Sequence, residues 1–369
     1  MSDKTNPAKG RWRTPWPIVL QWGAAIGFGI ALGALLGRLH LPAAAMVGPI
    51  IVGLIMAQRG TVIRVPLLVN RLSQGAASCL IALYLDAGML SQTLDIWPTI
   101  LVFVCLTFAV SCLTGVVVAT WTRLDRELTV WGFLPGMMGA VVLAAYEKGL
   151  NGSMVAFIQM LRLMSVIAVM VAVTAVLSGP ATPHSAGVEA ATLVSTLTGL
   201  GLCVIGVAIA KWLPFIPAGA SLGPLFLAAV LKLSGISVAM PEWLVTVAFW
   251  AIGIQVGLGL TVDLLRQGWR ALPGLMAGCL LLILLCAVSG IVLARIAGVD
   301  IMSGLLATVP GSIDSIALLA ISADADVSFV MTLQTVRLFA VATLGPLLAA
   351  SLSRFIGSRM KDRAIKARE

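Results

Sequence analysis

Charged residues are scarce in this chain. Asp, Glu, Lys and Arg make up 11% of its 369 residues, whereas hydrophobic residues make up 60%. Because a soluble domain carries about 25% charged residues, this chain lacks the polar surface that a soluble globular protein needs. At about 20 residues for each spanning helix, the length accommodates roughly ten spans. The composition therefore predicts an all-α integral membrane protein.

Clustered metal ligands are also lacking. The sequence has two histidines, His40 and His184, far apart, and its six cysteines lie in apolar runs without CxxC spacing. Zinc sites and disulfide frameworks both need closely spaced ligands or cysteines, so neither is indicated. We therefore expect no metal, no cofactor and no enzymatic activity, and we interpret the cysteines as small packing residues.

Basic residues gather at both ends of the sequence. Four lie within residues 1–16 and six within residues 353–369. Under the positive-inside rule, basic clusters beside a membrane span mark the cytoplasmic side. We expect both segments to be cytoplasmic tails, and we expect no direct binding of nucleic acid.

The sequence repeats itself at an offset of 175 residues. Residues 134–163 read LPGMMGAVVLAAYEKGLNGSMVAFIQMLRL, and residues 309–338 read VPGSIDSIALLAISADADVSFVMTLQTVRL. Prolines, glycines and one aspartate elsewhere keep this offset without a gap, which indicates duplication. We divide the chain into a membrane repeat at 17–178, a linker at 179–190 and a second membrane repeat at 191–352.

Apolar runs predict five spans and one broken segment in each repeat. The spans of the first repeat are 17–37, 43–57, 74–94, 97–121 and 153–178, with a broken segment at 132–147. Those of the second repeat are 191–212, 218–233, 241–262, 271–294 and 327–352, with a broken segment at 303–322.

Loop charges predict that the repeats have opposite orientations. The loop after the second span carries Arg59, Arg64 and Arg71, whereas its counterpart carries no basic residue. After the third span the pattern reverses, because Arg266 and Arg270 lie in the second repeat and none lies in the first. Since positive loops face the cytoplasm, this exchange favours two inverted repeats with re-entrant broken segments and ten spans. Twelve spans, with both broken segments crossing fully, is the alternative.

A Pro-Gly pair interrupts each repeat at an equivalent position. The pairs are Pro135-Gly136 and Pro310-Gly311. Backbone groups in a membrane need hydrogen-bond partners, so such a break survives only inside protein or beside a wet cavity. Corresponding breaks in inverted repeats mark the substrate site of many secondary transporters. We expect a short helix to begin near Ser312, with free N–H groups aimed at an anion or polar solute. A proline kink needed for packing is the alternative.

A glutamine and an arginine follow each break. Gln159 and Arg162 in the first repeat match Gln334 and Arg337 in the second, and three-residue spacing puts each pair on one helix face. An arginine at bilayer depth costs from about 3 to over 10 kcal/mol, so each needs a partner. These residues either contact a solute or tie their helices to carbonyls freed by the break.

Asp314 has no acidic counterpart, because Gly139 occupies the equivalent position. Three roles are open for its carboxylate. It is favoured by the helix dipole in the first turn, it pairs with Arg337, or it serves as a proton or cation site in a cavity.

Four stretches carry a family resemblance. They are LPAAAMVGP (41–49), PEWLVTVAFWAIGIQVGLGL (241–260), VDIMSGLLATVPGSIDSIALLA (299–320) and DVSFVMTLQTVRLF (326–339). The chain resembles the AbrB family of duplicated bacterial membrane proteins, which also carries an ammonia monooxygenase-like label. The resemblance implies a multi-pass protein of the bacterial inner membrane. The family pattern is S-P-G-G, and the second glycine is missing at both breaks of this chain.

The family names imply regulation of gene expression or ammonia oxidation. Tails of 16 and 17 residues are too short to fold as a DNA-reading module, so regulation would be indirect. An oxygenase would need a metal cluster, which two distant histidines do not offer. We expect a secondary-transporter-like carrier of a small polar or anionic solute, with a membrane-embedded regulator or sensor as the alternative and an enzyme third. The expected partners are the lipid bilayer and the solute, and a homodimer is compatible with the sequence.

Overall fold

The computed structural model describes residues 17–39, 41–84, 95–135, 141–142, 145, 148–177, 193–212, 219–236 and 238–340. Within these ranges all regular secondary structure is helical, which confirms the predicted all-α class for the described part of the chain. Gly136, the linker at 179–190 and both tails lie outside the described residues.

The first repeat contributes six long or medium helices. They are α1 (Ile18–Arg38), α2 (Ala44–Gln58), α3 (Leu67–Leu83), α5 (Trp97–Thr122), α6 (Arg126–Phe133) and α8 (Gly152–Leu177). The second repeat contributes α9 (Leu193–Trp212), α10 (Gly219–Leu233), α11 (Glu242–Leu258), α12 (Val262–Gly268), α13 (Leu272–Ala297), α14 (Ile301–Thr308), α15 (Ile313–Ser322) and the helix Val327–Ala340.

The duplication extends to the helix boundaries. Both ends of α2 and α10 differ by 175 residues, since 44 + 175 = 219 and 58 + 175 = 233. The same offset relates both ends of α3 to α11, of α5 to α13 and of α6 to α14. Repeated sequence therefore folds into repeated secondary structure, with the breaks in register.

One predicted span is wrong at its start. The span expected at 74–94 begins instead at Leu67, because Pro66 takes the N-cap position of α3. The polar residues Asn70 to Gln74 lowered the local hydropathy and displaced the predicted start. Arg71 consequently lies inside α3, and only Arg59 and Arg64 remain in the preceding loop.

Five described segments are long and apolar enough to cross a membrane. They are Ile18–Arg38, Trp97–Thr122, Gly152–Leu177, Glu242–Arg266 and Leu272–Ala297. Shorter apolar helices of 10–17 residues accompany them, among them α2, α3, α10 and α15. Large side chains such as Val19, Phe28 and Val176 are more than 60% exposed, as apolar groups facing lipid would be. These features agree with an integral membrane protein, and the count of ten spans stays a prediction.

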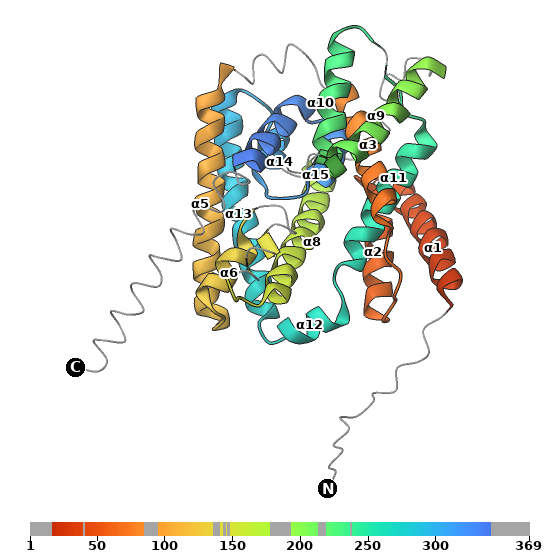
Figure 1. The fold of residues 1–369 in the computed structure, drawn as a ribbon. Helices are drawn as coiled ribbons and strands as arrows, with labels where there is room; N and C mark the ends of the chain where they lie inside the picture. The colour runs from red at the N-terminus through yellow and green to blue at the C-terminus, as the bar shows by residue number, and fades with distance from the viewer. Residues whose placement is uncertain are drawn as a thin grey trace, which may run out of the picture.

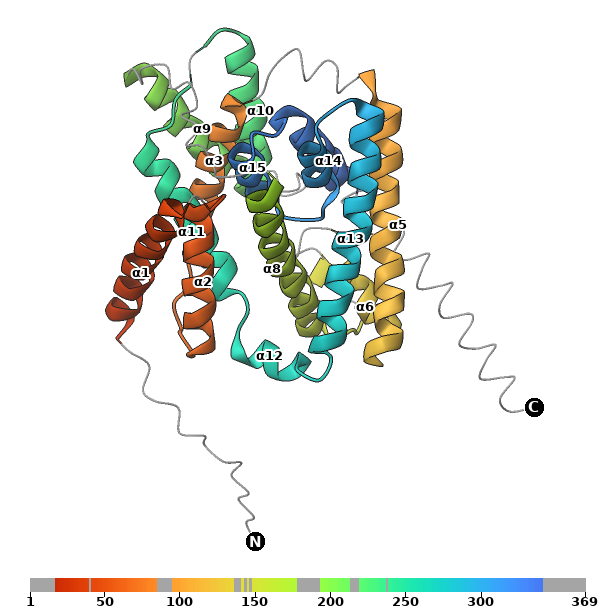
Figure 2. The same cartoon turned by 180° about the vertical axis from the view of Figure 1, so that it is seen from behind.

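The helices form one bundle with α8 near its centre (Figure 1). Helices α5 and α13 stand side by side at one edge, and α1 and α2 lie toward the other, as the reverse view in Figure 2 also shows. Helix α2 packs on α11, and the repeat-related α10 packs on α3. Helix α6 lies toward the lower end in Figure 1, whereas its counterpart α14 lies toward the upper end.

Glycines allow the closest helix contacts. A Cβ atom on Gly257 of α11 would overlap the carbonyl oxygen of Ile50 and approach Gly53 in α2. A Cβ atom on Gly304 of α14 would overlap the carbonyl of Gly290 in α13. Small residues at such crossings let membrane helices pack backbone to backbone.

We predict that Gly257→Ala destabilises the protein by about 1–3 kcal/mol, because the added methyl group forces α2 and α11 apart. Thermal unfolding of the detergent-purified protein measures the effect as a lower midpoint. Gly201→Ala is the matched control, because Gly201 is also helical and has no atom within 4 Å of the added Cβ. Equal midpoints for the two variants would contradict the predicted close contact.

Candidate functional site

The second break separates two short helices. Helix α14 ends at Thr308 and α15 begins at Ile313, with 8 and 10 residues respectively. At about 1.5 Å per residue, neither reaches the roughly 30 Å thickness of a hydrocarbon core. The predicted break at Pro310-Gly311 is confirmed. Ser312 caps α15 as expected, since its hydroxyl accepts a hydrogen bond from the Ser315 amide at 3.3 Å.

The first break begins in the same way. Helix α6 ends at Phe133, and Leu134 and Pro135 leave the helix. Both pre-break helices begin with a repeat-related aspartate cap, Asp125 for α6 and Asp300 for α14. Each carboxylate accepts backbone N–H bonds that would otherwise lack partners, so the sequence fixes where these helices start.

Arg162 of α8 reaches the end of α6. Its Nη1 donates to the carbonyl oxygens of Phe133 at 2.8 Å and of Leu134 at 3.0 Å. The last carbonyls of a helix lack intrahelical donors, and a cation beside them also suits the negative end of the helix dipole. This side chain is 7% exposed, so the pairing takes place inside the protein.

Arg337 makes the equivalent contacts in the second repeat. Its Nη1 donates to the carbonyl of Val309 at 3.0 Å, and its Nη2 donates to that of Gly311 at 3.3 Å. Leu134 and Val309 are repeat-related positions, so each arginine binds the same carbonyl of its own repeat. The structural role that the sequence left open is therefore present at both breaks.

The two glutamines extend this pattern. Gln159 donates to the carbonyl of Trp131 at 3.3 Å, and Gln334 donates to those of Leu306 at 2.7 Å and Val309 at 3.2 Å. Trp131 and Leu306 are again 175 residues apart. In each repeat, a Gln-Arg pair on one helix supplies hydrogen bonds to the end of a broken helix.

Several buried polar atoms at these pairs lack a protein partner. They are Oε1 of Gln159, Oε1 of Gln334 and Nε of Arg162. A buried unsatisfied group costs about 1–3 kcal/mol, so such atoms need an explanation. A bound polar molecule that offers both donors and acceptors would satisfy them.

The arginine charges are close together and uncompensated. The guanidinium groups of Arg162 and Arg337 lie near enough to interact electrostatically, and Cys286 of α13 lies near both. Among the described residues, no carboxylate forms an ion pair with either group. Two buried like charges without a counter-charge make this region a favourable place for an anion.

Asp314 contacts a different element from the one expected. Its carboxylate accepts a long hydrogen bond of 3.4 Å from the hydroxyl of Ser221, the third residue of α10. The expected pairing with Arg337 is wrong, because Arg337 binds carbonyls of the break instead. The carboxylate is 8% exposed and lies where the first turns of α15 and α10 meet. Sequence reasoning had no signal for Ser221, which is 93 residues away in the chain.

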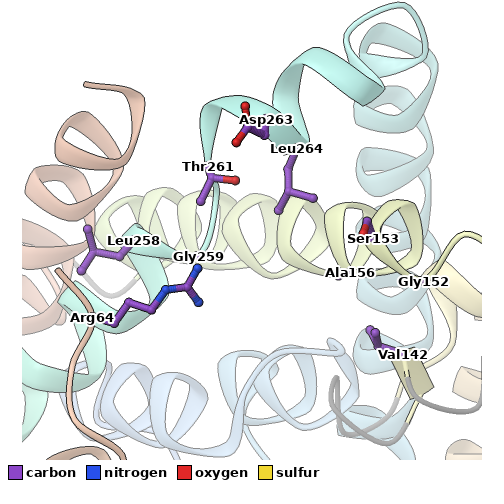
Figure 3. A pocket seen from close by; sticks show the side chains of 10 residues that line it. All are labelled: Arg64, Val142, Gly152, Ser153, Ala156, Leu258, Gly259, Thr261, Asp263 and Leu264. Carbon is purple, nitrogen blue, oxygen red and sulfur yellow. The ribbon is translucent and has the colours of Figure 1, made fainter. Parts of the chain in front are cut away.

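A pocket of about 460 Å³ lies at the start of α8 (Figure 3). Ser153 and Ala156 line it from α8, Thr261 and Asp263 from the start of α12, and the Arg64 side chain reaches toward Gly259. The sequence analysis used Arg64 only as an orientation signal and did not find this pocket, because its walls come from four separate segments.

The chain matches the family model described as "Transition state regulatory protein AbrB" over residues 46–353. The chain belongs to the AbrB family. It is 32% identical over 354 residues to "Putative regulator AbrB" of Escherichia coli (strain K12), covering 92% of this chain and 99% of that protein. It is 25% identical over 290 residues to "Uncharacterized protein YhjN" of Bacillus subtilis (strain 168), covering 71% and 73%. No solved structure matches it. The AbrB resemblance noted in the sequence is thus confirmed.

We predict that Gln334→Leu lowers stability by about 1–3 kcal/mol, because it leaves buried carbonyls of Leu306 and Val309 without this donor. The unfolding midpoint in detergent measures the loss. Gln255→Leu in α11 is the control, because that glutamine is exposed. A midpoint for Gln334→Leu equal to that of the control would show that these carbonyls do not depend on the glutamine.

Proposed function

We propose that this AbrB-family protein is a secondary-transporter-like carrier of a small anionic or polar solute in the bacterial inner membrane. The observation that carries the proposal is the pair of buried arginines at two repeat-related helix breaks. No enzymatic step is part of the proposal. The proposed mechanism is alternating access between two inverted repeats, in which each half moves against the other around one site.

The arrangement of the helices supports inversion. Helix α5 leads down to α6 at the lower end of Figure 1, whereas its counterpart α13 leads up to α14 at the upper end. Helices α2 and α10 are likewise toward opposite ends. Repeats that run in opposite directions also account for the exchange of positive loops between the halves. Both broken segments would then enter the membrane from opposite sides, with both chain ends cytoplasmic.

The solute would bind between the two Gln-Arg pairs. Arg162 and Arg337 supply positive charge, and the unsatisfied Nε of Arg162 is a free donor. The Oε1 atoms of Gln159 and Gln334 are acceptors, so a solute that carries N–H or O–H groups beside its negative charge fits best. Pro135, Gly136, Pro310, Gly311 and Ser312 would supply backbone groups at the same place.

Asp314 would couple transport to a proton or a cation. A buried carboxylate with one long hydrogen bond is poorly stabilised in its charged form, so it gains from taking up a proton or a cation. Its neighbour Ser221 lies in α10 of the same repeat, and α15 also touches the start of α2, where the Ala43 amide donates to Ser322 at 3.2 Å. A change at Asp314 would therefore reach both proline-containing helices α2 and α10.

A membrane-embedded regulator or sensor is the second candidate. The observation that favours it is the word "regulator" in the name of the Escherichia coli relative. Such a protein would use the same anion site for sensing and would act on gene expression through a cytoplasmic partner protein. Capture of one partner by the intact protein, with no solute movement in liposomes, would favour this function.

We predict that wild-type protein in liposomes carries a current or a flux of at least one small anion, and that Arg337→Gln abolishes it. Solid-supported membrane recording with inorganic phosphate, sulfate and short carboxylates as probes measures the flux. Arg270→Gln is the control, because Arg270 is exposed. Arg337→Lys keeps the charge while changing the geometry, and membrane insertion of each variant is checked separately. Wild-type flux through a correctly inserted Arg337→Gln variant would end the proposed role of this arginine.

We predict that Asp314→Asn removes the dependence of anion flux on an imposed proton or sodium gradient, because the amide cannot take up a proton or hold a cation. Downhill exchange of the anion should continue at a rate near that of the wild type. Asp95→Asn is the control, because Asp95 is exposed. Gradient-driven accumulation by the Asp314→Asn variant would show that coupling lies elsewhere.

A further inference from the structure

The pocket at the start of α8 is open on one side of the molecule. Its wall residues Val142, Ser153 and Ala156 are partly exposed, and Arg64 at its edge is exposed. Helix α12, which forms another wall, lies at the lower end in Figure 1, where α1 also begins. Gln159 and Arg162 follow these wall residues along α8, so the pocket leads toward the first Gln-Arg pair.

The repeat-related positions are buried. An offset of 175 turns Arg64, Val142, Ser153 and Ala156 into Ala239, Ala317, Ser328 and Met331. Their exposed fractions are 5%, 0%, 1% and 2%. One half of the protein thus has solvent-accessible wall residues at this place, and the other half has the same wall closed.

Side-chain size explains how the second place is closed. Val327 stands where the first repeat has Gly152, and Met331 stands where it has Ala156. Both larger side chains are at least 95% buried, at 5% and 2% exposure, and they occupy the volume that is empty in the first repeat. Methionine is unbranched with several rotatable bonds, so its side chain can leave such a space without movement of the helix.

We propose that Ala317, Ser328 and Met331 line a second access pocket on the opposite face of the protein, closed in this conformation. This inference rests on the proposed function. When the second pocket opens, the pocket between Arg64 and Ser153 closes, and the same small anion reaches the arginines from the other side. The two pockets are repeat-related, so each conformation is close to the other with the roles of the halves exchanged.

Cysteine labelling from each side of the membrane tests this proposal. Ser153→Cys and Ser328→Cys are introduced separately into protein in which Cys105 and Cys112 are replaced by serine, because the other four cysteines are buried. A membrane-impermeant maleimide is applied to intact cells and to inverted vesicles. Ser153→Cys should react from the side on which α1 begins. Ser328→Cys should react only from the opposite side, about 10- to 1000-fold more slowly, as expected for a minor state populated at 0.1–10%.

Exchanging the repeat-related wall residues provides the matched controls. Ala156→Met should close the first pocket, slowing the labelling of Ser153→Cys and speeding that of Ser328→Cys by about tenfold or more, since a shift of one residue's packing by 1.4 kcal/mol changes the population tenfold. Met331→Ala should open the second pocket and also speed the labelling of Ser328→Cys. Labelling in denaturing detergent checks that each new thiol can react.

The proposal is overturned if Ser328→Cys reacts only after denaturation in all three backgrounds, because Val327 and Met331 then fill the place permanently. Labelling of both new thiols from the same side also overturns it. The labelling and the transport measurements fail separately. Anion flux with a protected Ser328→Cys retains the transport proposal without this pocket. Reciprocal labelling without flux of any anion retains the two pockets and removes transport.

Discussion

Carbonyl groups at the ends of broken helices govern this structure. Breaking a helix in an apolar interior leaves oxygens without donors, and no water is at hand to replace them. Arg162 and Arg337 supply those donors, and Gln159 and Gln334 add more. The cost of burying two guanidinium groups is offset by bonds that the breaks could not otherwise make. The breaks therefore depend on the arginines, and the arginines are buried because of the breaks.

This mutual dependence has a consequence for function. A guanidinium that donates to neutral carbonyls keeps its positive charge, because a carbonyl oxygen carries no compensating charge. Two such groups near each other, with unsatisfied atoms beside them, leave a region that is structurally complete and electrostatically incomplete. An anion would add the missing charge without displacing the bonds that hold the helices. Structural and ligand-binding roles can thus reside in the same side chains.

The sequence predicted the repeated parts of the site well. The 175-residue offset placed both breaks, both Gln-Arg pairs and the Ser312 cap, because each follows from residues close together in the chain. It misjudged the start of α3, where polar residues lie within a helix, and the partner of Asp314. Ser221 and Asp314 meet only because α10 and α15 cross. No local pattern contains that information.

The sequence by itself determined the helical class, the duplication, the family and the positions at which the helices break, since hydrophobicity, proline and repeat spacing act locally. The tertiary structure alone decided what the buried polar groups contact and which of two repeat-related places is open. Ala156 and Met331 occupy equivalent positions in the sequence, yet one lines a pocket and the other is buried. Such differences arise from how neighbouring helices pack, because a cavity is a property of all its walls together.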